Sequence, residues 1–395
     1  MQPKAKQKII LVTTTRADWG ILSPLARALV QHDGVSLTVA AGNMHLLSRY
    51  GHTVDAIKAD GFIDVVALDV CDSDDDSHVT RTTMAAATAT SLARLIAERD
   101  ADAVIILGDR YEMLGAATAA LIAGVPIIHL HGGEISEGAI DDSVRHALSK
   151  MATLHLPATR KAAERLMMMG EEPSRIVQTG AIGVQNALNL IPMSREELSR
   201  SLEGFDVSPD KTLLVTFHPV TRHPEGIPTA QQVDNLIGAI EDVPDCNVII
   251  TFPNNDTGST GIIEKLEAFA KANKDRVYLV KSLGSARYIS AMHHAKAVVG
   301  NTSSGILEAP STPAYTIDIG PRQQGRERAL SVIHVDDNRN AIAGAIKQVL
   351  EAPRRNPRPE DNPYFLADSV QRAVDAITEV LPGLSMSKKF HTLSE

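Results

Sequence analysis

Short apolar runs alternate with helical patterns along the first part of this chain. Each run has only four to six residues, and an Ala- or Leu-rich segment separates it from the next one. Strands and helices that recur about every 20–30 residues are typical of a parallel sheet covered by helices on both faces. The apolar runs are Lys8–Thr13, Ser36–Ala40, Val65–Leu68, Ala103–Leu107, Pro126–Leu130 and Thr153–Leu156, and the helical patterns include Leu22–Val30, Met84–Glu98 and Tyr111–Ala123.

The same alternation begins a second time after a polar interval. Two such arrays predict two Rossmann-like α/β domains that face a cleft, residues 1–185 and residues 186–365. Residues 366–395 are expected to add a helix, Ala367–Val380, and a frayed polar tail, Ser385–Glu395. The second array has strand-like runs at Leu213–Thr216, Val248–Phe252, Val277–Val280, Ala297–Val299 and Tyr315–Ile319, and helical patterns at Ser194–Leu202, Gln231–Ile240, Thr260–Ala270, Ala286–His293 and Gly305–Ala309.

The composition fits two α/β domains and excludes several other classes of protein. The 395 residues are 44% hydrophobic and only 4% aromatic, so the cores must consist mainly of Ala, Val, Ile and Leu. A net charge of −9 without clustered Lys and Arg argues against nucleic-acid binding. No apolar run approaches the ~18 residues of a membrane span, and the N-terminal run is too short for a signal peptide. Two distant cysteines, Cys71 and Cys246, suit a reducing cytoplasm and form no metal-ligand cluster.

The first candidate site follows the first predicted strand, at Thr13–Asp18. A turn rich in hydroxyl groups at the start of a helix offers free backbone N–H groups to an anion. Arg16 is a candidate for a phosphate or base contact because its guanidinium donates in a bidentate manner. The alternative is a capped helix with a surface arginine. No G-x-G-x-x-G dinucleotide fingerprint is present.

The second candidate is Asp109, which directly follows a buried apolar strand within Gly108–Glu112. The carboxyl ends of the strands are where this architecture places its functional groups. Asp109 is therefore a candidate catalytic carboxylate. The residues alone support equally well an N-cap for the helix that follows.

The densest group of titratable residues begins at His129. Two glycines follow the strand there, and they allow the backbone to approach a ligand closely. His131, Glu134, Asp141 and Arg145 are candidates for acid–base chemistry in this stretch. Three alternatives stay open: His129 as a satisfied core histidine, Asp141 and Arg145 as an i,i+4 ion pair, and a His/Asp/Glu metal centre without H-E-x-x-H spacing.

Two further candidates lie in the second array. His218 follows a strand and precedes Pro219, which favours an extended backbone that aims the imidazole away from the sheet. A structural histidine is an equal alternative. The stretch Gly300–Gly305 suits a phosphate at a strand-to-helix turn, with a capping motif as the alternative. Glu308, one turn later, suits the hydroxyls of a ribose, and Arg322 lies in another strand-end loop.

Taken together, these stretches resemble one family, the hydrolysing UDP-N-acetylglucosamine 2-epimerases of sialic and nonulosonic acid biosynthesis. The resemblance covers about residues 8–350 and depends on seven motifs that occur in the family's order. The motifs are Thr15–Asp18, Gly108–Arg110, His131–Glu134, Asp141–Ser143 with Arg145-His146, Phe217–Pro219, Pro253–Asp256 and Gly300–Gly305 with Glu308.

The resemblance implies a fold of the GT-B type and a reaction that needs neither metal nor nicotinamide. A base removes the proton at carbon 2 of the sugar, UDP leaves by anti elimination, and water adds to the resulting glycal. The product is a free sugar of the manno configuration. By position, Asp109, Asp141 and His218 match catalytic residues of the family. Residues that match nucleotide contacts are Arg16, Ser282, Ser303, Ser304 and Glu308, and Arg145 lies in the active-site group. Asn255 and Gly305, within the motifs above, and Arg322, in its strand-end loop, are further candidate substrate contacts.

One departure from the family pattern affects both catalysis and the substrate. His131 stands where many relatives carry a catalytic glutamate, so either His131 or Glu134 is expected to take that role. The His-x-His-Gly-Gly-Glu form resembles a subgroup with 4-acetamido, 6-deoxy substrates. The substrate is therefore expected to be UDP-N-acetylglucosamine, giving N-acetylmannosamine and UDP, or UDP-N,N′-diacetylbacillosamine on a legionaminic acid route.

Two rival functions share this fold. A retaining GT-B glycosyltransferase would pass the sugar to an acceptor, but the acidic residues around Glu134 and Asp141 favour elimination. A non-catalytic nucleotide-sugar sensor would have lost its acids and bases, and the candidates for both are present here. The resemblance also implies a homodimer, whereas the sequence itself does not indicate an oligomeric state.

Overall fold

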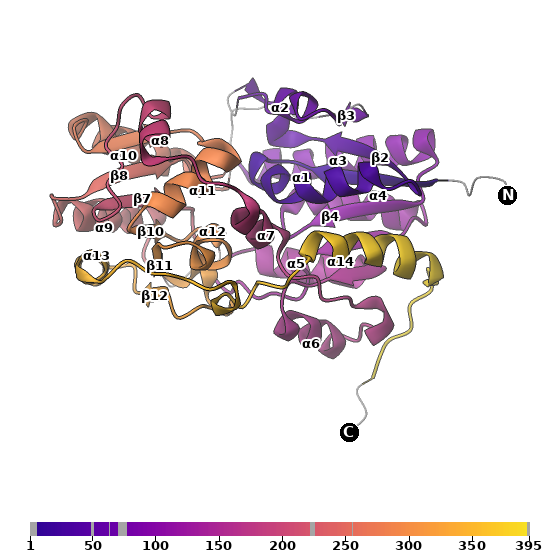
Figure 1. The fold of residues 1–395 in the computed structure, drawn as a ribbon. Helices are drawn as coiled ribbons and strands as arrows, with labels where there is room; N and C mark the ends of the chain where they lie inside the picture. The colour runs from indigo at the N-terminus through magenta and orange to yellow at the C-terminus, as the bar shows by residue number, and fades with distance from the viewer. Residues whose placement is uncertain are drawn as a thin grey trace. The chain divides into compact units, whose positions relative to one another are not determined.

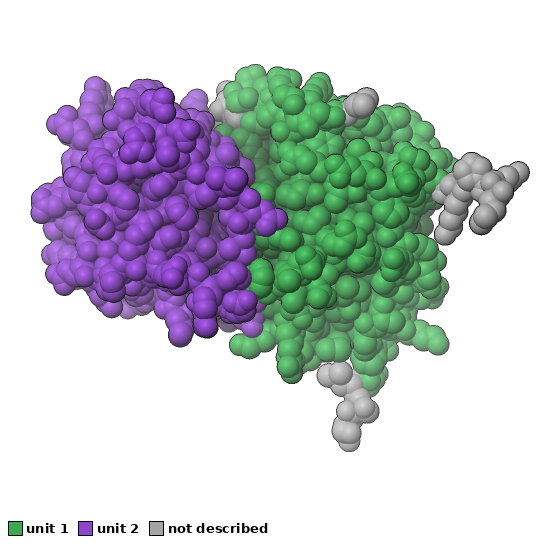
Figure 2. Space-filling view, in the orientation of Figure 1, with its two compact units in different colours: residues 1–134, 141–186, 364–395 green, residues 135–140, 187–363 purple. Residues whose placement is uncertain are grey.

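The computed structural model describes residues 6–48, 51–62, 64–69, 77–221, 226–254 and 256–392. The chain forms two compact units (Figure 2). Unit 1 comprises residues 1–134, 141–186 and 364–395, and unit 2 comprises residues 135–140 and 187–363. The chain thus gives a short segment, residues 135–140, to unit 2 before it forms the rest of that unit, and its last residues return to unit 1. Within the described ranges, no helix is both long and apolar enough to cross a membrane.

Unit 1 is built on a six-stranded parallel sheet in the order β3-β2-β1-β4-β5-β6. This is the order 3-2-1-4-5-6 of dinucleotide-binding folds, in which a ligand binds beyond the carboxyl ends of the first and fourth strands. The strands are β1 (Gln7–Thr13), β2 (Val35–Ala41), β3 (Val65–Ala67), β4 (Ala103–Leu107), β5 (Ile127–Leu130) and β6 (Leu154–Leu156). The helices are α1 (Arg16–Gln31), α2 (Val54–Ala59), α3 (His78–Arg99), α4 (Tyr111–Ile122), α5 (Asp141–Met151), α6 (Arg160–Met168) and, from the C-terminal segment, α14 (Ser369–Asp375).

Unit 2 repeats the same design, with the sheet order β12-β11-β10-β7-β8-β9. Here β7 and β10 are the adjacent strands at which the order reverses. The strands are β7 (Thr212–Thr216), β8 (Asn247–Thr251), β9 (Val277–Val280), β10 (Ala297–Gly300), β11 (Tyr315–Ile319) and β12 (Val332–Val335). The helices are α8 (Arg195–Ser201), α9 (Thr229–Glu241), α10 (Ser259–Ala272), α11 (Gly284–His294), α12 (Ser303–Leu307) and α13 (Arg339–Glu351), while α7 (Ile182–Asn189) spans the passage between the units.

Each unit buries its own hydrophobic core on both faces of its sheet. In unit 1 alternate residues of β1 point to opposite faces, so that Ile9 and Leu11 pack against α1 while Ile10 and Val12 pack toward α3 and α4. Aliphatic residues dominate both layers, as the low aromatic content predicts. The predicted fold class, two Rossmann-like α/β domains, is confirmed.

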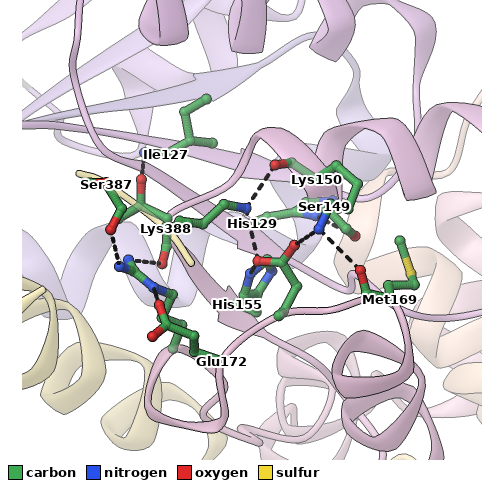
Figure 3. A network of polar contacts seen from close by, with 12 residues as sticks. Ile127, His129, Ser149, Lys150, His155, Met169, Glu172, Ser387 and Lys388 are labelled. Atoms are coloured by element: carbon green, nitrogen blue, oxygen red, sulfur yellow. Dashed lines mark hydrogen bonds and ion pairs between the residues drawn. The ribbon is translucent and has the colours of Figure 1, made fainter. Parts of the chain in front are cut away.

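The C-terminal segment completes unit 1. Helix α14 packs against α1 (Figure 1), and its extension contributes Ile377 and Leu381 to the same core as α1. The polar tail was expected to be frayed, and for its described part, up to residue 392, that prediction is wrong. Lys388 donates to Glu171 at 2.8 Å, and Ser387 accepts a hydrogen bond from Arg175 at 3.2 Å (Figure 3). A buried carboxylate that needs a cation holds the tail in place.

Candidate active site

The turn after β1 is organised by a capping box. The Thr15 side chain accepts from the Asp18 N–H at 3.2 Å, and Asp18 in turn accepts from the Thr14 and Thr15 N–H groups. The hydroxyl-rich turn is therefore a helix cap. Arg16, the first residue of α1, is half-buried, and burial lowers the pKa of its guanidinium. The capping alternative holds for Thr15 and Asp18, while Arg16 lies beyond the carboxyl end of β1.

Asp109 lies at the carboxyl end of β4, the strand next to β1. Gly108 has a φ of +71°, which turns the chain sharply, and its carbonyl accepts from His129 Nε2 at 2.7 Å. The N-cap alternative for Asp109 is wrong: Arg110 occupies the N-cap position of α4, and its side chain makes no capping hydrogen bond. The Asp109 carboxylate instead forms an ion pair with Arg145.

Arg145 joins two loops of unit 1 to its own helix, α5, and is only 1% exposed. Its Nη2 contacts Asp109 after β4, its Nη1 donates to the Glu134 carbonyl at 3.1 Å after β5, and Asp142 lies 3.8 Å away on α5. A planar guanidinium with several donors can hold all three groups at once, which an ammonium cannot. The structure thus brings Asp109, Glu134 and Arg145, all predicted site residues, into one network. Asp141 begins the same helix as Arg145.

The loop His131–Glu134 is held in an unusual conformation. His131 has a φ of +62°, in the left-handed region that only a few per cent of residues with a side chain adopt, most often Asn, Asp or His. Gly133 is also left-handed, and a Cβ there would overlap the carbonyl oxygen of Ala162 on α6. Both His131 and Glu134 are buried, and His131 Nδ1 lies 2.8 Å from Glu134 Oε1. The two predicted acid–base candidates therefore form a direct pair.

His129 is a core histidine, which is one of the alternatives that the sequence left open. Complete burial lowers its pKa to about 3, so the ring is neutral, and it positions the loop after β4 by donating to Gly108. Nδ1 lies 3.3 Å from Ser149 Oγ. Among the residues that the structure describes, no group of three or more His, Cys, Asp or Glu side chains is arranged to hold a metal ion.

In unit 2, His218 and Asn301 connect the carboxyl ends of β7 and β10. The Asn301 side chain accepts from the His218 N–H at 2.7 Å and donates to the His218 carbonyl at 2.8 Å. His218 Nδ1 accepts from the Asn254 N–H at 3.3 Å. In a neutral imidazole the proton then sits on Nε2, so His218 offers a hydrogen-bond donor at this strand end.

The turn after β10 requires its first glycine. Gly300 has a φ of +136°, and a Cβ there would overlap the Thr216 carbonyl oxygen of β7. Thr302 precedes α12 but makes no side-chain cap, so the capping alternative is wrong for this motif. Ser303 is exposed, whereas Ser304 is half-buried and its hydroxyl lies 2.7 Å from the Tyr288 hydroxyl.

The other predicted contacts of unit 2 that the structure describes lie at the same carboxyl edge of the sheet. Arg322 follows β11, is 8% exposed, and donates to the Asn301 carbonyl at 3.3 Å. Glu308 follows α12 and is half-buried, and Gly305 packs within α12. Ser282 follows β9, two strands away from β7, and accepts from the Gly284 N–H. Asn255 lies outside the described residues.

Sequence reasoning missed three residues that shape these sites. Asn301 and Tyr288 organise the strand ends of unit 2, and Glu112 is a fully buried carboxylate that contacts Asn43 and Arg110 in unit 1. Asn301 lies within the motif Gly300–Gly305. Its position, an amide side chain close after a predicted strand, could have marked it as a polar residue at the strand end. Tyr288 sits in the middle of α11, and no feature of the sequence distinguished it from a core residue.

The fold and these sites define a class of protein: an α/β enzyme of two Rossmann-like units, each with polar side chains at the carboxyl ends of its central strands. The chain belongs to the UDP-N-acetylglucosamine 2-epimerase family, whose family model matches residues 27–378.

Relatives match almost the whole chain. The UDP-N,N′-diacetylbacillosamine 2-epimerase (hydrolyzing) of Legionella pneumophila is 35% identical over 88% of this chain and 90% of its own. The polysialic acid biosynthesis protein P7 of Escherichia coli is 32% identical over 98% of each chain. The structure of Methanocaldococcus jannaschii UDP-GlcNAc 2-epimerase in complex with UDP-GlcNAc and UDP has a TM-score of 0.78 at 18% identity, over 94% of this chain and 99% of that one, so the two share the GT-B-like fold.

Proposed function

We propose that the protein is a hydrolysing 2-epimerase that converts a UDP-2-acetamido sugar and water into UDP and a free 2-acetamido sugar of the manno configuration. The observation that carries this proposal is the network of half-buried Asp109 with buried Arg145, Glu134 and His131 at the carboxyl ends of β4 and β5. A protein that only binds a nucleotide sugar has no need for such a set of acids and bases. Relatives with hydrolysing epimerase activity in their names support the assignment.

The chemistry explains why the reaction requires groups of this kind. The proton at carbon 2 is weakly acidic because no adjacent carbonyl activates it, so a closely positioned base is necessary. Departure of UDP must be assisted at the same time, and donors aimed at the leaving phosphate stabilise its charge. Carboxylates stabilise the positive charge that develops at carbon 1, as they do in glycosidases.

Each unit then has a separate task. In unit 1, Asp109, Asp141 and the paired His131 and Glu134 supply the acid–base machinery, and Arg145 holds Asp109 in place. In unit 2, the Nε2–H of His218 donates to an oxygen of the leaving group. The nucleotide contacts that we propose are Arg16 of unit 1 and, in unit 2, Asn255, Ser282, Ser303, Ser304, Gly305, Glu308 and Arg322. The reaction uses no metal and no nicotinamide.

Two substrates are consistent with the relatives: UDP-N-acetylglucosamine, which gives N-acetylmannosamine, and UDP-N,N′-diacetylbacillosamine, which carries a second acetamido group. We propose that the protein catalyses this reaction with both UDP-sugars and that it takes part in the synthesis of sialic or related acids. The ratio of kcat/KM for the two sugars identifies the preferred substrate.

One experiment separates this function from its rivals. The protein is incubated with each UDP-sugar in deuterated water, and the products are followed by NMR. Hydrolytic epimerisation gives UDP together with a free manno-sugar that carries deuterium at carbon 2. Release of a sugar without deuterium would rule out elimination, and a strict requirement for an acceptor would identify a glycosyltransferase. Return of a deuterated UDP-sugar without hydrolysis would identify a non-hydrolysing epimerase.

A further inference from the structure

His131 carries two separate energetic costs. Its left-handed backbone, with a φ of +62°, is a sparsely populated conformation that costs free energy for a residue with a side chain. Its Nε2 atom is buried and has no hydrogen-bond partner among the described residues, and a buried unsatisfied nitrogen also costs free energy. Costs of both kinds are typical of functional groups that the surrounding structure holds in place.

The surroundings of His131 prevent the loop from relaxing. A Cβ at Gly132 would lie 2.9 Å from both His129 Nδ1 and Ser149 Oγ, and one at Gly133 would overlap the backbone of α6. The His131 N–H donates to the Leu156 carbonyl at 3.1 Å, which anchors the loop to β6. These contacts fix the backbone at His131 and thereby the position of its imidazole.

The contact with Glu134 determines which ring nitrogen carries the proton. Glu134 Oε1 lies 2.8 Å from Nδ1, and an ionised carboxylate only accepts hydrogen bonds, so Nδ1 carries the hydrogen. In the neutral ring Nε2 then carries the lone pair. Two other carboxylates of the network form ion pairs. Asp109 pairs with Arg145, and Asp142 lies within ion-pair distance of Arg145 and His146.

We infer that His131 Nε2 is the base that removes the proton from carbon 2 and that Glu134 is its positioning residue; this inference rests on the proposed function. The Nε2 lone pair takes the proton, and the C2–H electron pair forms the C1–C2 double bond. The C1–O bond breaks, and its electron pair leaves with the β-phosphate oxygen of UDP. The imidazolium that forms is stabilised by the Glu134 carboxylate, as in a Ser-His-Asp triad.

The second half of the reaction restores the balance. The oxygen of water bonds to carbon 1, and a proton is delivered to the opposite face of carbon 2 by another acid, which water reprotonates. His131 returns its proton to solvent. The net change is addition of one water molecule to the substrate and release of UDP, with inversion at carbon 2.

The chain offers a matched control. His52 is also left-handed, with a φ of +46°, and its Nδ1 lies 2.7 Å from Asp55, three residues later, as His131 does with Glu134. The His52 side chain is 48% exposed, in the loop before α2. Asn and Gly both accept this backbone, so substitutions at the two positions remove the imidazole without added strain.

The test compares His131→Asn and His131→Gly with His52→Asn and His52→Gly. Loss of a general base lowers rates by about 10²–10⁴-fold, so we expect kcat of both His131 variants to fall by that factor while UDP affinity stays within about threefold. Added imidazole is expected to restore part of the activity of His131→Gly. The His52 variants are expected to match the wild-type protein. Either His131 variant binding UDP normally and keeping more than a tenth of wild-type kcat would overturn the assignment.

Glu134 requires a readout that a purely structural role would not change. Glu134→Gln alone is expected to lower kcat by about 10–100-fold with little change in KM. In the His131→Gly background the same substitution is expected to cost nothing more, because a positioning residue acts only through its partner. Additive losses would contradict this role. The proposed function is tested separately, because the wild-type protein either forms or fails to form the C2-deuterated product.

Discussion

Asp109 shows how one side chain at a strand end is assigned a role by its partners. It directly follows Gly108 after β4 and pairs with the buried Arg145, rather than capping α4. We expect Asp109→Asn to lower turnover by at least about 10²-fold, because the amide can neither transfer a proton nor balance developing positive charge. UDP affinity, measured by calorimetry, is expected to stay the same.

Asp102 provides the control for this substitution, since it precedes β4 at the opposite end of the same strand. Its carboxylate accepts from the Lys8 N–H at 2.7 Å, and an amide oxygen can still accept that bond. Asp102→Asn is expected to keep wild-type turnover. Near-normal turnover of Asp109→Asn would remove Asp109 from the catalytic group.

At individual residues, the sequence predicted the positions of functional side chains better than their partners. Asp109 and His218 could be selected because each follows a buried run. The tautomer of His218, by contrast, depends on a hydrogen bond from the Asn254 N–H. The backbone of His218 is held by hydrogen bonds with the side chain of Asn301, 83 residues away. Such pairs arise from the neighbouring strands of a folded sheet, which local spacing does not encode.

Between elements, the loop after β5 packs directly against α6 through Gly133. This glycine has a φ of +81°, and a Cβ there would overlap the Ala162 carbonyl oxygen. We expect Gly133→Ala to lower the free energy of unfolding by about 2–4 kcal/mol, from backbone strain together with a steric overlap that neither backbone can avoid. Urea denaturation measures the change.

A substitution at Gly124 distinguishes the cost of backbone strain from the cost of steric overlap. It has a φ of +70° at the end of α4, and a Cβ there would meet no atom within 4 Å. Gly124→Ala is therefore expected to cost only the backbone strain, about 1–2 kcal/mol. Equal losses at the two positions would show that the contact with α6 contributes nothing.

Helices and strands could be predicted where apolar residues recur with clear helical spacing or form a continuous run. Runs such as Ala103–Leu107 and Tyr315–Ile319 coincide with β4 and β11. Strand β12 was missed because it lies at the edge of the sheet, where three of its four residues are only partly buried and His334 is exposed. Helix α13 was also missed, although Ile342, Ile346 and Val349 follow helical spacing and are buried. Helix α1 begins before its predicted start, because the capping box at Thr15 sets its first turn.

At the scale of the whole molecule, the C-terminal segment completes unit 1 after the chain has formed unit 2. Deletion of residues 385–395 removes the contacts of Lys388 with Glu171 and of the His391 N–H with the Gly170 carbonyl. We expect a lower Tm, by roughly 2–4 °C for each kcal/mol lost. The kcat is expected to be unchanged, because the tail contacts lie near the amino end of β6, whereas Asp109 follows the carboxyl end of β4. A large loss of kcat in the folded variant would contradict this separation.

The strongest pH dependence within this contact belongs to Glu171, which is 1% exposed (Figure 3 shows its surroundings). Burial opposes its ionisation, but hydrogen bonds from His155, Lys150 and Lys388 exceed that effect and lower its pKa from 4.5 to about 2. A carboxylate with a lowered folded pKa stabilises the fold above its unfolded pKa, and this stabilisation is lost as the pH falls through the folded value. The shift corresponds to about 3 kcal/mol, present above about pH 4.5 and lost toward pH 2.

Replacing Glu171 by Gln isolates this contribution. At pH 7, Glu171→Gln leaves Lys150 and Lys388 without their shared anion and is expected to lower the free energy of unfolding by about 3 kcal/mol. The difference from the wild-type protein is expected to shrink as the pH falls from 4.5 toward 2, since the wild-type carboxyl becomes neutral there. Urea denaturation at several pH values measures it, with Glu164→Gln, in an exposed pair with Arg160, as the control expected to change nothing. A difference that stays constant across this range would mean that the charge of Glu171 does not stabilise the contact between the tail and unit 1.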